Sequence, residues 1–202
     1  MDETSKHKRQ DLRPVSFGHL HWSEAEKIDS LNTVFSYAVN HANEVIDWYL
    51  LSKRRKKQCA SYLRIVSILL TTIAVLIPII AEICDCIPAI WATVFFAIAA
   101  TCVAFDRFFG CSSSWMRYMA AEHKVRQLLH EFEIDREVLK VEWEDSGPEK
   151  GQIVDGLKAA KTFIIKIDDV VKNETEQWRA EFQGVIKDID KATKSNKIKD
   201  FS

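Results

Sequence analysis

Two apolar segments separated by a short turn constrain the fold of this chain more than any other feature. The ranges 65–81 and 87–105 contain no Asp, Glu, Lys or Arg, whereas the rest of the sequence is densely charged. A helix of roughly 17–25 apolar residues crosses the hydrocarbon core of a bilayer. The connection at 82–88 is so short that it permits only an antiparallel return. The sequence therefore predicts a transmembrane helical hairpin.

The main alternative is a hairpin stored inside a soluble helical fold, as in some pore-forming toxins. The other helices predicted here have only narrow apolar faces, which could not easily wrap two helices that are apolar on all sides. The first twenty or so residues are polar, and the first apolar segment begins only at Ile65. We therefore expect no cleaved signal peptide and a first span that stays in the mature protein.

Basic residues are found at the open end of the hairpin and not at its connecting turn. They lie before the first span and after the second, whereas the connecting turn carries Glu82 and Asp85. The positive-inside rule then places both termini in the cytoplasm. The basic run 53–57 either sets this topology or binds anionic or inositol lipids. The charges expected at the membrane face are Lys53, Arg54, Arg55, Lys56, Lys57, Arg64, Asp106 and Arg107.

Helical periodicity flanks the hairpin. Apolar residues recur at steps of three and four before the first span, and no Gly or Pro follows the Ser23–Glu26 capping-box pair until Pro78. Gly110 and the stretch 145–148 are further boundaries. We expect a flexible N-terminus at 1–22, a cytoplasmic helix at 23–60 that continues into the membrane, the hairpin at 61–110 with spans at about 63–82 and 87–107, cytoplasmic helices at 112–144 and 150–191, and a disordered tail at 192–202.

The predicted fold class is an all-α membrane protein, in which long amphipathic cytoplasmic helices flank a two-helix transmembrane hairpin and form an oligomeric helical bundle. The helix seams expected to pack within or between subunits contain Phe35, Ala42, Tyr49, Ile164, Val171 and Trp178. Small and hydroxylated residues also share a face of each span, where they permit close helix approach. This stripe either packs inside the hairpin or lines a pore in an oligomer, and it contains Ser67, Thr71, Ala74, Pro78, Thr93, Ala97 and Ala104.

Motifs for catalysis or cofactor binding are absent from the sequence. It has no Gly-rich phosphate loop, nucleophile elbow, Cys-x-x-Cys pair or His-Glu-x-x-His. His123 and His130 could share a helix face, but they lack neighbouring ligands at metal-site spacing. We therefore expect no enzyme, no cofactor and no metal. The near-neutral charge balance also gives no sign of a nucleic-acid partner.

The stretch from Trp91 through Phe105-Asp-Arg-Phe-Phe-Gly-Cys-Ser-Ser-Ser-Trp-Met-Arg-Tyr118 resembles the SLATT family, and so does the later Glu131-Phe-Glu-Ile-Asp135. SLATT proteins are small bacterial two-transmembrane effectors associated with nucleotide-signalling conflict systems. The resemblance implies an inner-membrane protein that stays dormant until infection is sensed. Because no nucleotide-binding or synthetase domain is attached, the resemblance also implies that sensing comes either from a separate sensor or nucleotide-signal synthetase encoded nearby, or from direct ligand binding among the cytoplasmic helices.

Two functions follow as hypotheses. In the first, a homo-oligomer opens a pore or disrupts the membrane lipids around it, since one hairpin provides too little wall for an aqueous path. Because the spans contain no charge, such a pore would have no charged selectivity ring in the membrane. In the second, the chain is a non-conducting membrane scaffold whose cytoplasmic helices recruit a partner.

Overall fold

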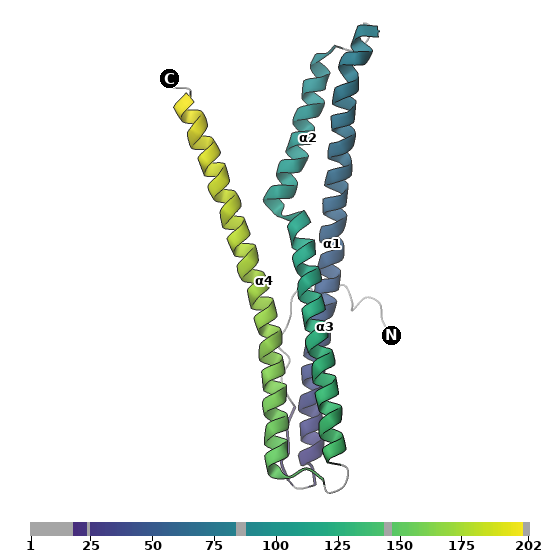
Figure 1. The fold of residues 1–202 in the computed structure, drawn as a ribbon, viewed down its shortest axis with the longest axis vertical. Helices are drawn as coiled ribbons and strands as arrows, with labels where there is room; N and C mark the ends of the chain where they lie inside the picture. Colours follow the sequence, from purple (N-terminus) through teal and green to yellow (C-terminus); the bar gives the residue numbers. More distant parts are fainter. Residues whose placement is uncertain (1–17, 24, 84–87, 144–146, 200–202) are drawn as a thin grey trace. The chain divides into compact units, whose positions relative to one another are not determined.

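The computed structural model describes residues 18–23, 25–83, 88–143 and 147–199. These residues form four α-helices and no strand. The helices are α1 (Lys27–Ile83), α2 (Ile90–Phe109), α3 (Cys111–Glu142) and α4 (Lys150–Lys199) (Figure 1). The all-α prediction is confirmed.

The chain divides into two compact units. The first, here called the bundle unit, comprises Met1–Leu51 and Tyr118–Thr175, and the second, the hairpin unit, comprises Ser52–Arg117 and Glu176–Ser202. Both α1 and α4 contribute to each unit. No Gly or Pro interrupts the 57 residues of α1 before Pro78, which is why this helix runs unbroken from the bundle residues into the first apolar segment.

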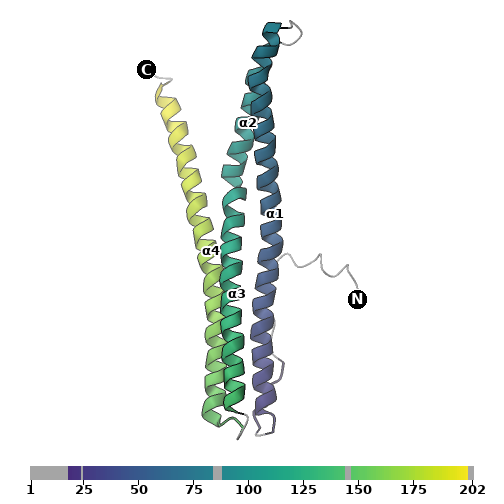
Figure 2. The ribbon, with the colours of Figure 1, turned by 45° about the vertical axis from the view of Figure 1, so that its right-hand side comes forward.

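The bundle unit consists of the first part of α1, most of α3 and the first half of α4, which lie side by side in Figures 1 and 2. Its core is a layer of aromatic rings between aliphatic side chains. Phe132 of α3 stacks on Phe163 of α4 at 4.3 Å between ring centroids and meets Phe35 of α1 edge-on at 5.6 Å. At Gly156 of α4, an added Cβ would lie 3.3 Å from the side chains of Leu31 and Phe35. A glycine at this position therefore lets α4 approach α1 closely.

The start of α1 differs slightly from the prediction. Ser23 and Glu26 do pair, but the Ser23 hydroxyl donates to the Glu26 carboxylate at 2.9 Å, and the helix begins only at Lys27. At the other end of the chain, α4 continues to Lys199, past the predicted helix end at 191. After Gly184 no Gly or Pro follows to stop it, and Lys and Asp are compatible with helix.

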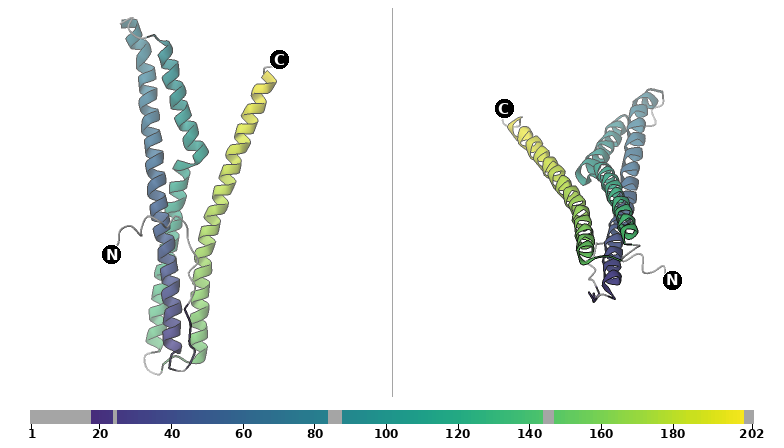
Figure 3. Two further views of the ribbon diagram at one scale, coloured as in Figure 1. Left: turned by 180° about the vertical axis from the view of Figure 1, so that it is seen from behind. Right: turned by 60° about the horizontal axis from the view of Figure 1, so that its bottom comes forward.

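The hairpin unit contains the last part of α1 and the antiparallel α2, which lie beside each other in the left view of Figure 3. It also contains the first turns of α3 and the second half of α4. Most of the connecting turn, which includes Cys84 and Cys86, lies outside the described residues, as do most of the predicted flexible N-terminus and residues 200–202.

Candidate functional site

The outer surface of the hairpin is apolar and exposed. Large side chains on both helices lie mostly open, for example Val75 of α1 at 61% exposure and Phe96 of α2 at 60%. The most apolar 18-residue window of α1 is only 17% buried. The corresponding window of the helical segment that begins at Ile90 is only 11% buried. A core helix of a soluble fold would be mostly buried. Both helices are long and apolar enough to cross a membrane.

The inner face of the hairpin is narrow and consists mainly of small residues, with Ile77 as a larger buried side chain. Ser67 Oγ of α1 donates to the carbonyl oxygen of Ala99 in α2 at 3.3 Å. Ala99 is buried, and so is Ala74 on α1. Thr71 lies on the same side of α1, where its hydroxyl donates to the Ser67 carbonyl at 2.8 Å. The small side chains at these positions allow the two helices to pack closely.

The remaining stripe residues lie elsewhere. Pro78, Thr93, Ala97 and Ala104 are exposed and do not contribute to the inner face of the hairpin. The rotation of α2 turns Ala99 inward instead, and the spacing of small residues could not choose between these two faces. On the outward face, a shallow groove of about 350 Å³ is lined by Ile90, Thr93, Val94, Ala97, Ile98 and Thr101.

The hairpin ends in a sharp elbow between α2 and α3. Gly110 adopts a left-handed conformation with φ of 57° and is the C-cap of α2, which is the break that the sequence predicted. An L side chain is strained at this φ. The Asp106 carboxylate accepts hydrogen bonds from the Ser112 backbone N–H at 3.0 Å and from the Ser112 hydroxyl at 2.5 Å. Asp106 therefore caps the start of α3 from the preceding helix.

A second charge reaches the same serine from α1. Arg64 donates to Ser112 Oγ at 3.0 Å. Ser112 thus accepts from an arginine and donates to a carboxylate, so that α1, α2 and α3 meet at a single hydroxyl.

The second half of α4 supplies acidic partners for two arginines near the elbow. Arg107 of α2 pairs with Asp188 at 2.9 Å, and Arg117 of α3 pairs with Glu181. Phe108 and Phe182 meet edge-on at 6.1 Å between ring centroids. Sequence reasoning missed Glu181 and Asp188. Their seven-residue spacing, which puts both on one helix face, was the available signal.

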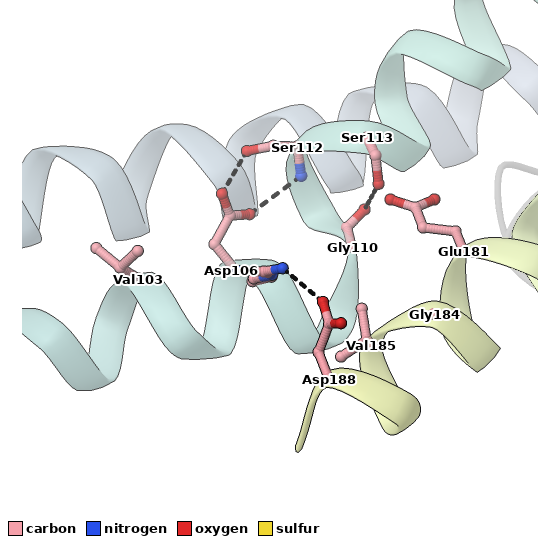
Figure 4. A pocket seen from close by; sticks show the side chains of 10 residues that line it. Val103, Asp106, Gly110, Ser112, Ser113, Glu181, Gly184, Val185 and Asp188 are labelled. Atoms are coloured by element: carbon pink, nitrogen blue, oxygen red, sulfur yellow. Dashed lines mark hydrogen bonds and ion pairs between the residues drawn. The ribbon is translucent and has the colours of Figure 1, made fainter. Parts of the chain in front are cut away.

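These elements surround an open pocket of about 490 Å³. Figure 4 shows Asp106 turned toward Ser112 on one side of it, while Asp188 and Glu181 project from α4 on the other. The pocket is lined by Val103, Asp106, Arg107, Gly110, Ser112, Ser113, Glu181, Gly184, Val185 and Asp188. Both signs of charge line it, and its one lining arginine, Arg107, already has a carboxylate partner in Asp188. The arrangement favours a mechanical joint over a site for one strongly charged ligand.

The other predicted residues lie along α1 and α4. The basic run is solvent-accessible on α1, with Arg54, Arg55 and Lys57 exposed and Lys53 and Lys56 half-buried, and Arg64 is exposed. In the seams, Phe35, Ala42 and Tyr49 are buried in the core of the bundle unit, so a single chain already covers them. Ile164 and Val171 are half-buried, whereas Trp178 is exposed.

Among the described residues, no group of three or more His, Cys, Asp or Glu side chains could hold a metal ion. The exposed hairpin and the four helices define an all-α membrane protein with two transmembrane segments. The family model for the SMODS and SLOG-associating 2TM effector domain 2 matches residues 11–198, and the chain belongs to this family. No curated protein and no solved structure matches the chain.

Proposed function

We propose that this chain is the membrane effector of a bacterial anti-phage system of the abortive-infection type. When a partner protein or a nucleotide signal activates it, several copies assemble and open a pore in the inner membrane or disrupt it. The observation that carries the proposal is the exposed, charge-free surface of both hairpin helices, in a chain that belongs to an effector family.

Assembly is part of the proposal because one hairpin cannot enclose water. The inner face is occupied by contacts such as Ser67 to Ala99, which leaves no aqueous path between the two helices. The groove at Thr93, Ala97 and Thr101 has small side chains at steps of four residues. Such a surface lets a helix from another copy approach closely within lipid.

The proposed topology places both termini in the cytoplasm, with the basic run of α1 at the headgroups of the inner leaflet. Positive charges near the ends of spans are retained on the cytoplasmic side. The elbow would then lie close to the same surface, where a soluble sensor or a signal synthetase encoded nearby can reach α4.

The proposed control acts through the joint between α4 and the elbow. The Arg107–Asp188 pair is largely exposed on both sides, and exposed ion pairs contribute little to stability, about 0–1 kcal/mol. This ion pair therefore adds only a small cost when a partner that binds the second half of α4 separates it from α2. The exposed Trp178 and Ile186 offer that partner an apolar contact on the same helix.

Leakage from liposomes tests the proposal directly. The purified full-length protein is reconstituted in vesicles that contain a quenched dye, with and without the proteins encoded beside it, and the mass of the detergent-solubilised particle is measured in parallel. We expect dye release together with an oligomeric particle in the activated sample. If the protein inserts and the vesicles still retain the dye under every condition, the pore hypothesis is wrong. Stable capture of one partner by such a non-conducting protein would instead support the scaffold hypothesis.

A matched pair of variants tests the groove. Ala97→Leu fills the groove on α2, whereas Ala100→Leu adds the same side chain at an exposed position outside it. We expect Ala97→Leu to reduce both assembly and leakage at least several-fold and Ala100→Leu to leave both close to the parent. Equal behaviour of the two variants would show that copies do not meet at this groove.

A further inference from the structure

Two cysteines from distant parts of the sequence meet beside the elbow. Cys59 lies on α1 and Cys111 is the first residue of α3, and their Sγ atoms are 3.0 Å apart. Both residues belong to the hairpin unit. A disulfide bond is about 2.05 Å long, so a movement of about 1 Å between the sulfurs would allow a bond to form.

The two thiols have different surroundings. Cys59 is exposed, whereas Cys111 is only 4% exposed. Burial, followed by the hydrogen bond to Cys59, raises the pKa of the Cys111 thiol to about 11, against a smaller opposing effect of Lys56. A thiolate is the nucleophile in thiol–disulfide exchange. A reagent from solution therefore meets Cys59 first, and Cys111 reacts second.

We propose that Cys59 and Cys111 form a reversible dithiol–disulfide site, oxidised by a low-molecular-weight disulfide such as oxidised glutathione. In the first step, the Cys59 thiolate attacks one sulfur of the oxidant, a mixed disulfide forms, and one oxidant thiolate leaves. In the second step, Cys111 loses its proton to solvent and attacks Cys59 Sγ, which expels the second oxidant thiolate. The two protein thiols are oxidised by two electrons and the oxidant disulfide is reduced to two thiols.

The location gives this bond a structural consequence. Cys111 adjoins Ser112, whose hydroxyl accepts a hydrogen bond from Arg64 and donates one to Asp106. A covalent bond from Cys59 would tie α1 to the first residue of α3 and hold the elbow in the arrangement described here. The proposed topology places this pair in the reducing cytoplasm, where disulfides form mainly as transient or sensing devices, so in that topology the reduced pair is the resting form and oxidation is the signal.

Peptide mapping tests the bond independently of any pore. The full-length protein, with Cys84→Ser and Cys86→Ser, is incubated with oxidised glutathione, its remaining thiols are alkylated, and its peptides are analysed by mass spectrometry. We expect one cross-linked peptide pair that joins Cys59 to Cys111 and disappears on reduction, while Cys102 is alkylated. Substitution of the exposed cysteine, Cys59→Ser, should abolish the cross-link, whereas Cys102→Ser should retain it. Separate alkylation or persistent glutathionylation of Cys59 in the parent, or equal cross-linking to Cys102, would overturn the proposal.

The pH dependence distinguishes a true second step by Cys111. The groups that face this thiol are Cys59 and Lys56 from α1 and Asp106 from α2. Below its raised pKa, the thiolate fraction of Cys111 grows about tenfold for each pH unit. Conversion of the mixed disulfide to the cross-link should therefore accelerate about tenfold per unit between pH 7 and pH 9. A rate that is independent of pH in this range would contradict attack by the buried thiol.

One further readout rests on the proposed function. If the elbow must move for the pore to open, the oxidised protein should leak several-fold less than the reduced protein after activation, and Cys59→Ser should leak equally with and without oxidant. If the cross-link forms and leakage is unchanged, the disulfide has no role in gating, but the disulfide site itself is still confirmed. Absence of leakage in every sample would count against the proposed function alone, because the peptide map still decides the site.

Discussion

The bundle unit buries large apolar side chains within the chain, whereas the hairpin unit leaves side chains of similar size exposed. In the bundle unit, large apolar side chains such as Phe35, Phe132 and Ile167 are buried by other helices of the same chain. In the hairpin unit, side chains of similar size such as Val75 and Phe96 are exposed. One unit supplies its own apolar environment, whereas the other depends on lipid or on further copies. Substitutions in the two units should therefore fail in different ways.

The largest effect on this comparison is expected from an aromatic truncation in the bundle core. Phe132→Ala removes the ring that contacts both Phe163 and Phe35. Such truncations cost about 3–5 kcal/mol, and hydrogen exchange of the α1, α3 and α4 amides in the full-length protein measures the loss. Phe96→Ala on α2 is the matched control and should leave these amides protected. Similar deprotection by both variants would erase the difference between the units.

A charge placed on each unit's surface sharpens the comparison next. Val75 and Val138 are similarly exposed, at 61% and 53%, but they belong to the hairpin unit and the bundle unit respectively. Lysine at the centre of a span costs about 2.5–3.5 kcal/mol on insertion scales, whereas it is well solvated in water. We expect Val75→Lys to lower the alkali-resistant membrane fraction and Val138→Lys to leave it unchanged. An equal loss of the membrane fraction in both variants, or a larger loss in Val138→Lys, would contradict the claim that only the hairpin unit contacts lipid.

The elbow should show an intermediate effect. Asp106→Asn removes the carboxylate that accepts two hydrogen bonds from Ser112, and the loss of a helix cap costs about 1 kcal/mol. Faster hydrogen exchange at the start of α3 measures this change. Asp155→Asn is a suitable control because it removes only an exposed pair with Lys158. If the amides near Ser112 exchanged at the parent rate in Asp106→Asn, the carboxylate would not be the cap.

The smallest effect at neutral pH is expected for Tyr49, whose buried hydroxyl has no hydrogen-bond partner among the described residues. Tyr49→Phe removes this group and should change stability by less than about 1 kcal/mol, in the stabilising direction. Burial, with Glu174 and Tyr118 nearby, raises the pKa of Tyr49 well above its usual range.

The sign of the alkaline effect of Tyr49 follows from that raised pKa. The unfolded chain loses the Tyr49 proton near pH 10, whereas the folded chain retains it, so the stabilisation is complete below about pH 10 and is lost as the pH rises further. Thermal unfolding between pH 8 and pH 11 should thus show a smaller alkaline loss in Tyr49→Phe than in the parent. An identical loss in both proteins would exclude Tyr49 as its source.

The sequence predicted those features that depend on local chemistry. Runs without charge defined the hairpin, and Gly110 marked the elbow because few other residues adopt a positive φ. It could not predict which face of α2 turns toward α1, because Ala97 and Ala99 are equally small and only packing selects Ala99. It also could not pair Cys59 with Cys111, which lie 52 residues apart, nor Arg107 with Asp188. Such pairs depend on how whole helices align.

The depth of the hairpin in a bilayer tests the central claim most directly. Single spin labels are placed at exposed positions, namely Leu69, Val75, Phe96 and Val103 in the hairpin unit and Val138 and Ile165 in the bundle unit. Their collisions with oxygen and with a water-soluble nickel reagent are measured in liposomes. We predict that the hairpin labels meet oxygen but not nickel, most strongly near the middle of each span, and that the bundle labels meet nickel freely. Hairpin labels as open to nickel as those of the bundle would contradict the account.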